Sequence, residues 1–207
     1  MGLDMYLHKK VTGYRKADGS LTHSMKDYTE DELGASNIET IVTTVGYWRK
    51  ANSIHRWFVE NVQDGEDNCE EYSVSVEQLK DLLKTCMKVI KAVDGETITI
   101  NPSKEEDISK YDWLKDCPKS FVFDASNLDA MAEKLRYVHQ LPKTFAKVAN
   151  ETLPSVSGFF FGDTDYDSWY LESVIKTARI ITRILDNYKK LPTAEKRDVE
   201  FAYQASW

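Results

Sequence analysis

Apolar and polar residues alternate in residues 3–8, so that every second side chain lies on the same face. A period of two is typical of a half-buried β-strand, and we expect a strand here. Residues 39–45 are almost all β-branched, which predicts a second strand. The alternation returns in residues 199–207, where we expect a terminal strand.

Apolar residues recur at helical spacing in four other segments: 49–62, 76–93, 126–138, and from about residue 165 to 188. The second of these begins with Ser75 followed three residues later by Gln78, a capping-box arrangement, and ends at Asp94-Gly95. Pro142 interrupts or restarts the third segment, because proline lacks the amide hydrogen that an interior turn of a helix requires.

Three short segments are also expected to be strands. Residues 97–100 and 121–123 are short and rich in β-branched or aromatic side chains. Residues 159–161 are three phenylalanines between Gly158 and Gly162, which we interpret as a short buried strand.

These elements lack the regular strand–helix alternation of a doubly wound sheet, so the α+β class is favoured. We expect a small antiparallel sheet packed against several helices. The length of 207 residues suits one domain spanning residues 1–207.

The charge of the chain is acidic, with 34 Asp and Glu against 27 Lys and Arg and a net charge of −7. We do not expect nucleic acid as a partner, because phosphate neutralisation needs clustered cations. The charge is also uneven, since residues 64–71 hold five carboxylates and no Lys or Arg. Such a segment is typical of an exposed loop.

The compartment expected from the sequence is the cytoplasm. The first residues lack a basic region followed by an apolar stretch, so we expect no signal peptide, and we expect no contact with a membrane. Cys69, Cys86 and Cys117 are odd in number and widely spaced, which favours reduced thiols over a disulfide framework.

A second acidic cluster consists of Asp163, Asp165 and Asp167, followed by Glu172. Oxygen-rich clusters can bind Ca²⁺ or Mg²⁺. The calcium-loop template fails here, because Ser168 replaces the sharp-turn glycine. We favour a structural role at the start of a helix, where carboxylates cap free amides, and expect neither a metal nor a cofactor.

The densest mixture of aromatic and polar side chains lies in residues 47–58. On a helix, Arg49, Asn52 and Arg56 share a stripe, with His55 next to it and Trp48 before it. Guanidinium groups bind planar anions in a bidentate manner, so this stripe is a candidate site for a phosphate, a carboxylate or a protein partner. The alternative is a solvent-exposed face whose arginines pair with the acidic loop.

A further candidate set is Asp4, Tyr6 and His8, which project from one face of the first strand if the alternation holds. A carboxylate that orients an imidazole can support acid–base chemistry. No Ser or Cys stands in a nucleophile motif, however, and a polar strand face is the commoner outcome.

Three stretches together resemble a family of small proteins encoded by bacteriophages and bacterial genomes. They are the MGLDMYL start, the YWRKAN segment at residues 47–52 and the GFFFG segment at residues 158–162. The resemblance spans most of the chain and implies an intracellular bacterial setting and a phage accessory role. It implies no cofactor and no catalytic residue.

Two functions follow from these observations. The first is a non-enzymatic interaction protein of phage or prophage type that binds a host or viral macromolecule, with a protein as the expected partner. The alternative is a small enzyme or ligand-binding domain that acts on a phosphorylated or carboxylated small molecule. The alternative requires the strand face and the arginine stripe to converge on one pocket.

Overall fold

The structure is a computed structural model that describes residues 2–14, 16, 18–20, 22, 38–100, 120–135 and 137–207. Its strands are β1 (Asp4–Tyr14), β2 (Ile38–Arg49), β3 (Tyr72–Val74), β4 (Thr97–Ile100), β5 (Ser120–Val122), β6 (Val138–Gln140) and β7 (Val199–Ser206). Its helices are α2 (Asn52–Asn61), α3 (Val76–Lys91), α6 (Leu128–Leu135), α7 (Lys143–Thr152), α8 (Ser168–Lys190) and α9 (Thr193–Lys196). The expected α+β class is confirmed.

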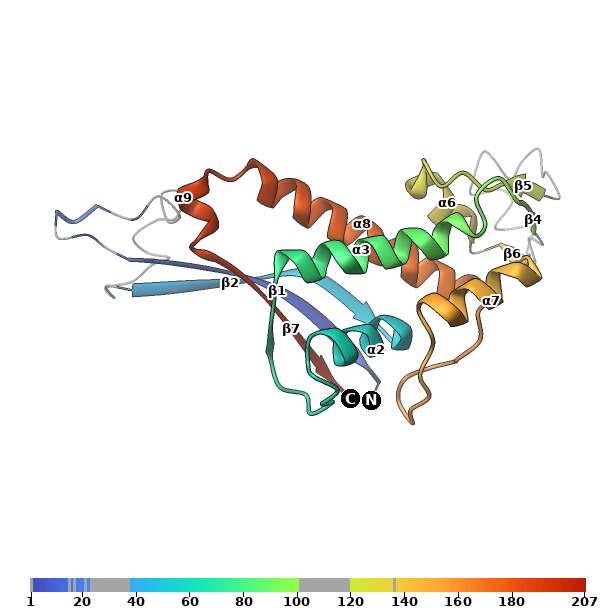
Figure 1. Ribbon diagram of the computed structural model, residues 1–207, viewed down its shortest axis with the longest axis horizontal. Helices are drawn as coiled ribbons and strands as arrows, with labels where there is room; N and C mark the ends of the chain where they lie inside the picture. The colour runs from blue at the N-terminus through green and yellow to red at the C-terminus, as the bar shows by residue number, and fades with distance from the viewer. Residues whose placement is uncertain are drawn as a thin grey trace, which may run out of the picture.

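The main sheet has four antiparallel strands in the order β2-β1-β7-β3. Helices α3 and α8 pack side by side and extend along one side of this sheet (Figure 1). The two ends of the chain lie close together, because β1 and β7 are antiparallel neighbours. In the described residues β2 has one neighbour only and forms an edge of the sheet.

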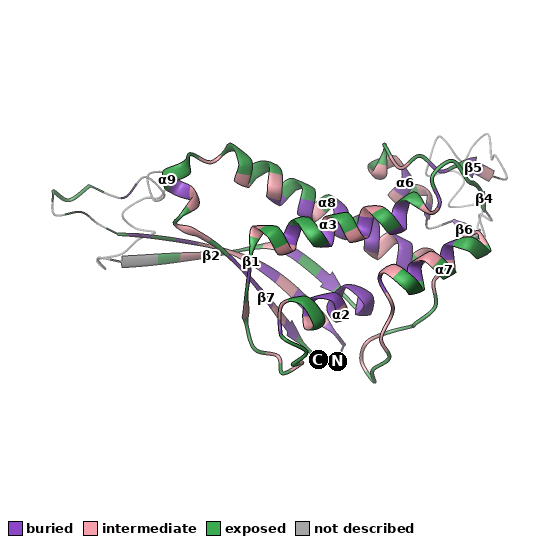
Figure 2. Ribbon diagram, in the orientation of Figure 1, coloured by how far each residue is buried: buried purple, intermediate pink, exposed green. Residues whose placement is uncertain are grey.

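A smaller antiparallel sheet, in the order β5-β4-β6, lies with α6 and α7 at the opposite end of α3 and α8 from α9 (Figure 1). Both parts share one continuous cluster of buried side chains, which runs from Met5 in β1, and Leu3 just before it, to Phe121 and Phe145 at the far end. Figure 2 shows this buried material where α3 and α8 face each other and the sheets.

The alternation predicted for the first strand determines which face of the main sheet is covered. Leu3, Met5 and Leu7 are fully buried, whereas Asp4 and Tyr6 between them are partly exposed. Cross-strand partners share a face, so Trp48, which lies opposite Met5, is buried with them. The main sheet therefore has an inner face against the helices and an outer face of polar and aromatic side chains.

The predicted capping box of α3 is present. The Ser75 side chain accepts from the Gln78 amide, and the Gln78 side chain accepts from the Ser75 amide. Cys86 of α3 is buried, and this burial raises the pKa of its thiol. Cys69 and Cys86 are free thiols, and Cys117 lies outside the described residues.

Three predictions about local structure are wrong. The helix predicted from residue 49 begins at Asn52, because β2 continues through Arg49 and Lys50 then turns with φ of 57°. The helix predicted for 126–138 ends at Leu135, and Val138 belongs to β6. Residues 159–161 form a turn rather than a buried strand, and Phe159 is 95% exposed.

Candidate functional site

The outer face of the main sheet brings together four of the eight candidate residues. Asp4, Tyr6 and His8 project from β1 on the face opposite to the buried Leu3, Met5 and Leu7. Arg49 joins them from β2, because it is the cross-strand partner of Asp4. Arg49 was expected on a helix, and the length of β2 moves it to the sheet.

Aromatic rings and hydrogen bonds organise this outer face. The Tyr47 hydroxyl donates to Asp4 Oδ1 over 2.5 Å, and the Tyr47 and Tyr6 rings lie 5.4 Å apart. Tyr6 and His8 have parallel rings 6.0 Å apart, and His8 Nδ1 lies 3.2 Å from Thr44 Oγ1. These contacts hold large side chains in place while leaving them accessible.

The electrostatics of Tyr47 reflect this arrangement. The hydrogen bond to the Asp4 carboxylate raises the pKa of the Tyr47 hydroxyl, because it stabilises the protonated phenol. The negative charge of Asp4 acts in the same direction. The ammonium group of Lys176 lies 5.6 Å from the centre of the Tyr47 ring, so α8 contributes a cation at this edge of the face.

The candidate His55 is buried and has structural contacts. Its Nε2 lies 3.0 Å from Asp67 Oδ2, and its Nδ1 lies 2.8 Å from the hydroxyl of Tyr203. Because a carboxylate only accepts, Nε2 donates to Asp67, and in the neutral ring Nδ1 accepts from Tyr203. Asp67 also accepts from the Trp207 indole at 3.2 Å. His55 thus ties α2 to the acidic loop and to β7.

The other three candidates also have local partners. Trp48 is buried, and its indole donates to Thr177 Oγ1 over 2.8 Å. Asn52 is buried and donates to the Asp163 carbonyl over 2.6 Å. Arg56 pairs with Glu60 one turn further along α2, at 2.6 Å. Arg49 and Asn52 line a common pocket of about 670 Å³, together with the acidic cluster Asp163, Asp165 and Asp167. Asp4, Tyr6, His8 and His55 do not line this pocket, so the strand face and the arginine stripe do not converge in it.

Asp167, in the second acidic cluster, has the role expected at a helix start. Its side chain accepts from the Tyr170 amide as the N-cap of α8, and Asp163 Oδ1 accepts from the two amides that follow it. In the described part of the chain, no group of three or more His, Cys, Asp or Glu side chains has the arrangement of a metal site.

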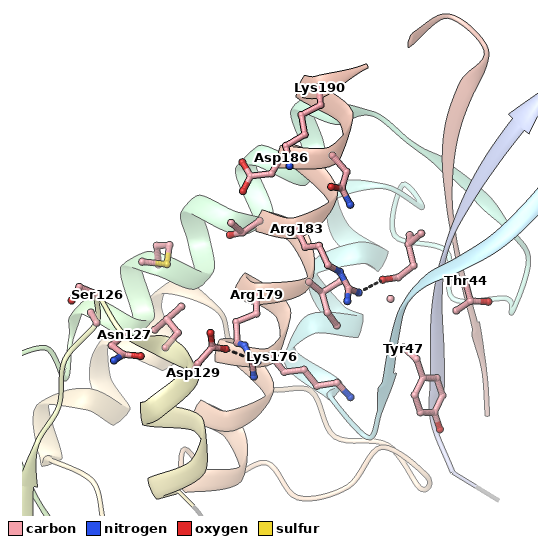
Figure 3. Close-up of a pocket in the computed structure, with 18 residues that line it drawn as sticks. Thr44, Tyr47, Ser126, Asn127, Asp129, Lys176, Arg179, Arg183, Asp186 and Lys190 are labelled. Carbon is pink, nitrogen blue, oxygen red and sulfur yellow. Dashed lines mark hydrogen bonds and ion pairs between the residues drawn. The ribbon is translucent and has the colours of Figure 1, made fainter. Parts of the chain in front are cut away.

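A groove that sequence reasoning missed lies between β2 and α8 (Figure 3). We call it the β2–α8 groove. It has a volume of about 1090 Å³, and its β2 wall consists of the four consecutive residues 44–47. Helix α8 lies opposite β2, and residues 125–129 line the groove on the side of α8 that faces away from β2 (Figure 3). Figure 3 shows Lys176 and Arg183 extending from α8 toward β2.

The α8 wall of the groove is cationic. It carries Lys176, Arg179, Arg183 and Lys190, against the carboxylates Asp129 and Asp186. Arg179 pairs with Asp129 at 2.5 Å, and Arg183 donates to the Val45 carbonyl at 3.1 Å. The spacing of these cations along one predicted helix was the signal in the sequence that could have indicated this wall.

None of the helices in the described ranges combines the length and apolar character needed to cross a membrane. Comparisons of the chain with family models, with curated proteins and with solved structures returned no match.

Proposed function

We propose that this protein is a non-enzymatic interaction protein that binds a protein partner on the outer face of its main sheet. The observation that carries the proposal is the accessible Tyr6–Tyr47–Asp4 network beside Arg49. Tyr and Arg are enriched among the residues that dominate binding energy at interfaces. Side chains that are already ordered lose less conformational entropy on binding.

The resemblance stated above supplies the setting of the proposal, in which the partner is a host or viral protein in a bacterial cell. The acidic loop at residues 64–71 contributes to orientation, because carboxylates at the rim of an interface steer a basic partner. The enzyme alternative is not favoured, because His55 has its ring nitrogens committed to Asp67 and Tyr203.

An affinity experiment tests this function. The tagged chain is incubated with lysates of uninfected and phage-infected bacteria, and captured proteins are identified by mass spectrometry. The same experiment uses a Tyr6→Ala variant and an Arg49→Ala variant, at two positions that do not line the β2–α8 groove, and Lys147→Ala on α7 as the control. Circular dichroism verifies that each variant is folded.

We expect one stoichiometric partner that the wild type and Lys147→Ala retain and that the outer-face variants lose. The proposal is wrong if no lysate yields a stoichiometric partner. It is also wrong if the folded outer-face variants retain the partner as well as the wild type does.

A further inference from the structure

We propose that the β2–α8 groove binds an extended acidic segment of the partner, which adds to the main sheet as a further strand beside β2. This inference deepens the proposed function and depends on it for the class of partner. It concerns an adjoining surface, because the groove lies at the edge of the sheet and shares Thr44 and Tyr47 with the outer face.

The first argument is that β2, an edge strand of the main sheet, lines the groove. Thr44 and Tyr47 contact His8 and Asp4 on the outer face, whereas a Cβ at Gly46 would point toward Trp48 and Ile180. Residues on both faces of β2 line the groove, so the groove follows the edge of the strand. Gly46 has no side chain and lines the groove with its backbone alone. The N–H and C=O groups of an edge strand are the groups that pair with an incoming strand.

The second argument comes from a bulge in β2. Leu7 pairs with Gly46 and His8 pairs with Thr44, so Val45 between them has no partner in β1. The carbonyl of Val45 accepts from Arg183 of α8 instead. The Val45 carbonyl is therefore a backbone hydrogen-bond acceptor that faces the groove, and Arg183 already donates to it there.

The third argument is charge complementarity. Four cationic side chains and two carboxylates line the groove, and Arg179 is already neutralised by Asp129. The cations that remain favour carboxylates, to which guanidinium groups bind through charge-assisted hydrogen bonds. An extended peptide fits better than nucleic acid, because the β2 edge offers amide groups in the spacing of a strand.

These arguments define an exchange of hydrogen bonds. An amide N–H of the incoming segment donates to the Val45 carbonyl, and Arg183 turns to a carboxylate of the same segment. An acidic residue thus provides a charged acceptor for the guanidinium, whereas a neutral or basic segment provides only uncharged acceptors, which form weaker hydrogen bonds. The exchange explains why both the backbone edge and the cations are required.

The test selects displayed random peptides on the immobilised full chain. We expect enrichment of peptides rich in Asp and Glu and poor in proline. The best peptide is then measured by fluorescence polarisation in two N-methylated forms, with alternate amides blocked. Only one set of alternate amides faces β2 in an added strand, so one form should lose binding and the other should retain it.

Two variants with the same change of net charge separate the groove from general electrostatics. Arg183→Glu/Lys190→Glu should lower the affinity for the peptide by about tenfold or more, which is the effect of losing a hydrogen bond to a charged group. The control is Lys143→Glu/Lys147→Glu on the exposed side of α7, and it should leave binding within about twofold. Arg183→Gln provides a milder variant if the double variant does not fold.

Each other outcome overturns the inference. In the peptide selection, these outcomes are that no peptide is enriched or that basic peptides are enriched. In the binding measurements, they are that both methylated forms bind equally well, or that the two charge variants weaken peptide binding equally. The last is that oligo(dT) binds the chain while no acidic peptide does. If no acidic peptide binds while the affinity experiment still yields a partner, only the proposal for the β2–α8 groove is wrong. If the lysates yield no partner while an acidic peptide binds the groove, the proposal that a partner binds the outer face is wrong.

Discussion

Arg183 of α8 donates to the backbone carbonyl of Val45, the bulged residue of edge strand β2, over 3.1 Å. This bond is the direct link between the cationic wall of the β2–α8 groove and the backbone edge of the main sheet. It also means that the Val45 carbonyl already accepts a hydrogen bond at this edge.

The exchange proposed for Arg183 requires that its hydrogen bond to Val45 contribute little to the free energy of unfolding, so that an incoming strand can replace it. We expect Arg183→Gln to lower the free energy of unfolding by less than about 1 kcal/mol, because the bond is exposed to solvent. Urea denaturation measures the change. A loss of about 3 kcal/mol or more would mean that Arg183 is a structural residue, and the exchange would then be excluded.

A larger effect is expected in the buried cluster around His55. Tyr203→Phe keeps the ring that stacks on Phe58 at 3.9 Å but removes the hydroxyl that faces His55 Nδ1. The buried nitrogen then has no partner, so we expect a loss of about 1–3 kcal/mol in unfolding free energy. Tyr72→Phe, which removes a hydroxyl in an exposed contact, should cost less than about 0.5 kcal/mol. Equal losses in both variants would contradict the structural role of His55.

Gly46 is predicted to tolerate no side chain. A Cβ at this position would lie 2.8 Å from the Trp48 ring and 3.1 Å from Ile180, so the ring would have to move. We expect Gly46→Ala to destabilise the fold by about 1–3 kcal/mol, as overpacked cores do. Thr44→Ala on the exposed side of the same strand is the control and should change stability by less than about 0.5 kcal/mol. An unchanged unfolding midpoint for Gly46→Ala would refute this packing.

The Tyr47–Asp4 bond predicts a pH dependence. Because Asp4 raises the pKa of Tyr47, the bond contributes stability below the ordinary tyrosine pKa of 10.0, and this contribution is lost as pH rises through the folded value. The difference in phenolate absorbance between wild type and Tyr47→Phe isolates this residue from the other tyrosines. Asp4→Asn should shift the Tyr47 titration to lower pH. An unshifted titration in Asp4→Asn would show that the carboxylate is not the cause.

Parts of the fold that depend on local pattern could be predicted from the sequence. The alternation in residues 3–8 predicted the inner and outer faces of β1, and Ser75 with Gln78 predicted the start of α3. Both signals arise from residues within a few positions of each other. The three errors lie where the local pattern is ambiguous. They are residues 49–51, where β2 continues through Arg49, the end of the helix predicted to reach Val138, and the three phenylalanines at residues 159–161.

The sites could be predicted only in part, because their geometry depends on long-range contacts. Asp4, Tyr6 and His8 share a face as the strand period requires. His55 meets Tyr203, 148 residues away, and Arg183 meets Val45, 138 residues away. Neither pairing has a signal in the spacing of the sequence. The groove likewise requires knowing that β2 is an edge strand and that α8 lies beside it.

The central claim is that a protein partner binds the outer face of the main sheet. The most direct test is site-specific photo-crosslinking in bacterial cells. A photoreactive amino acid replaces Tyr47, which belongs to the outer face and also lines the groove. A second chain carries it in place of Lys147 on α7. We predict one discrete adduct from position 47 and none of that mass from position 147. No adduct at position 47, or the same adducts from both positions, would contradict the claim.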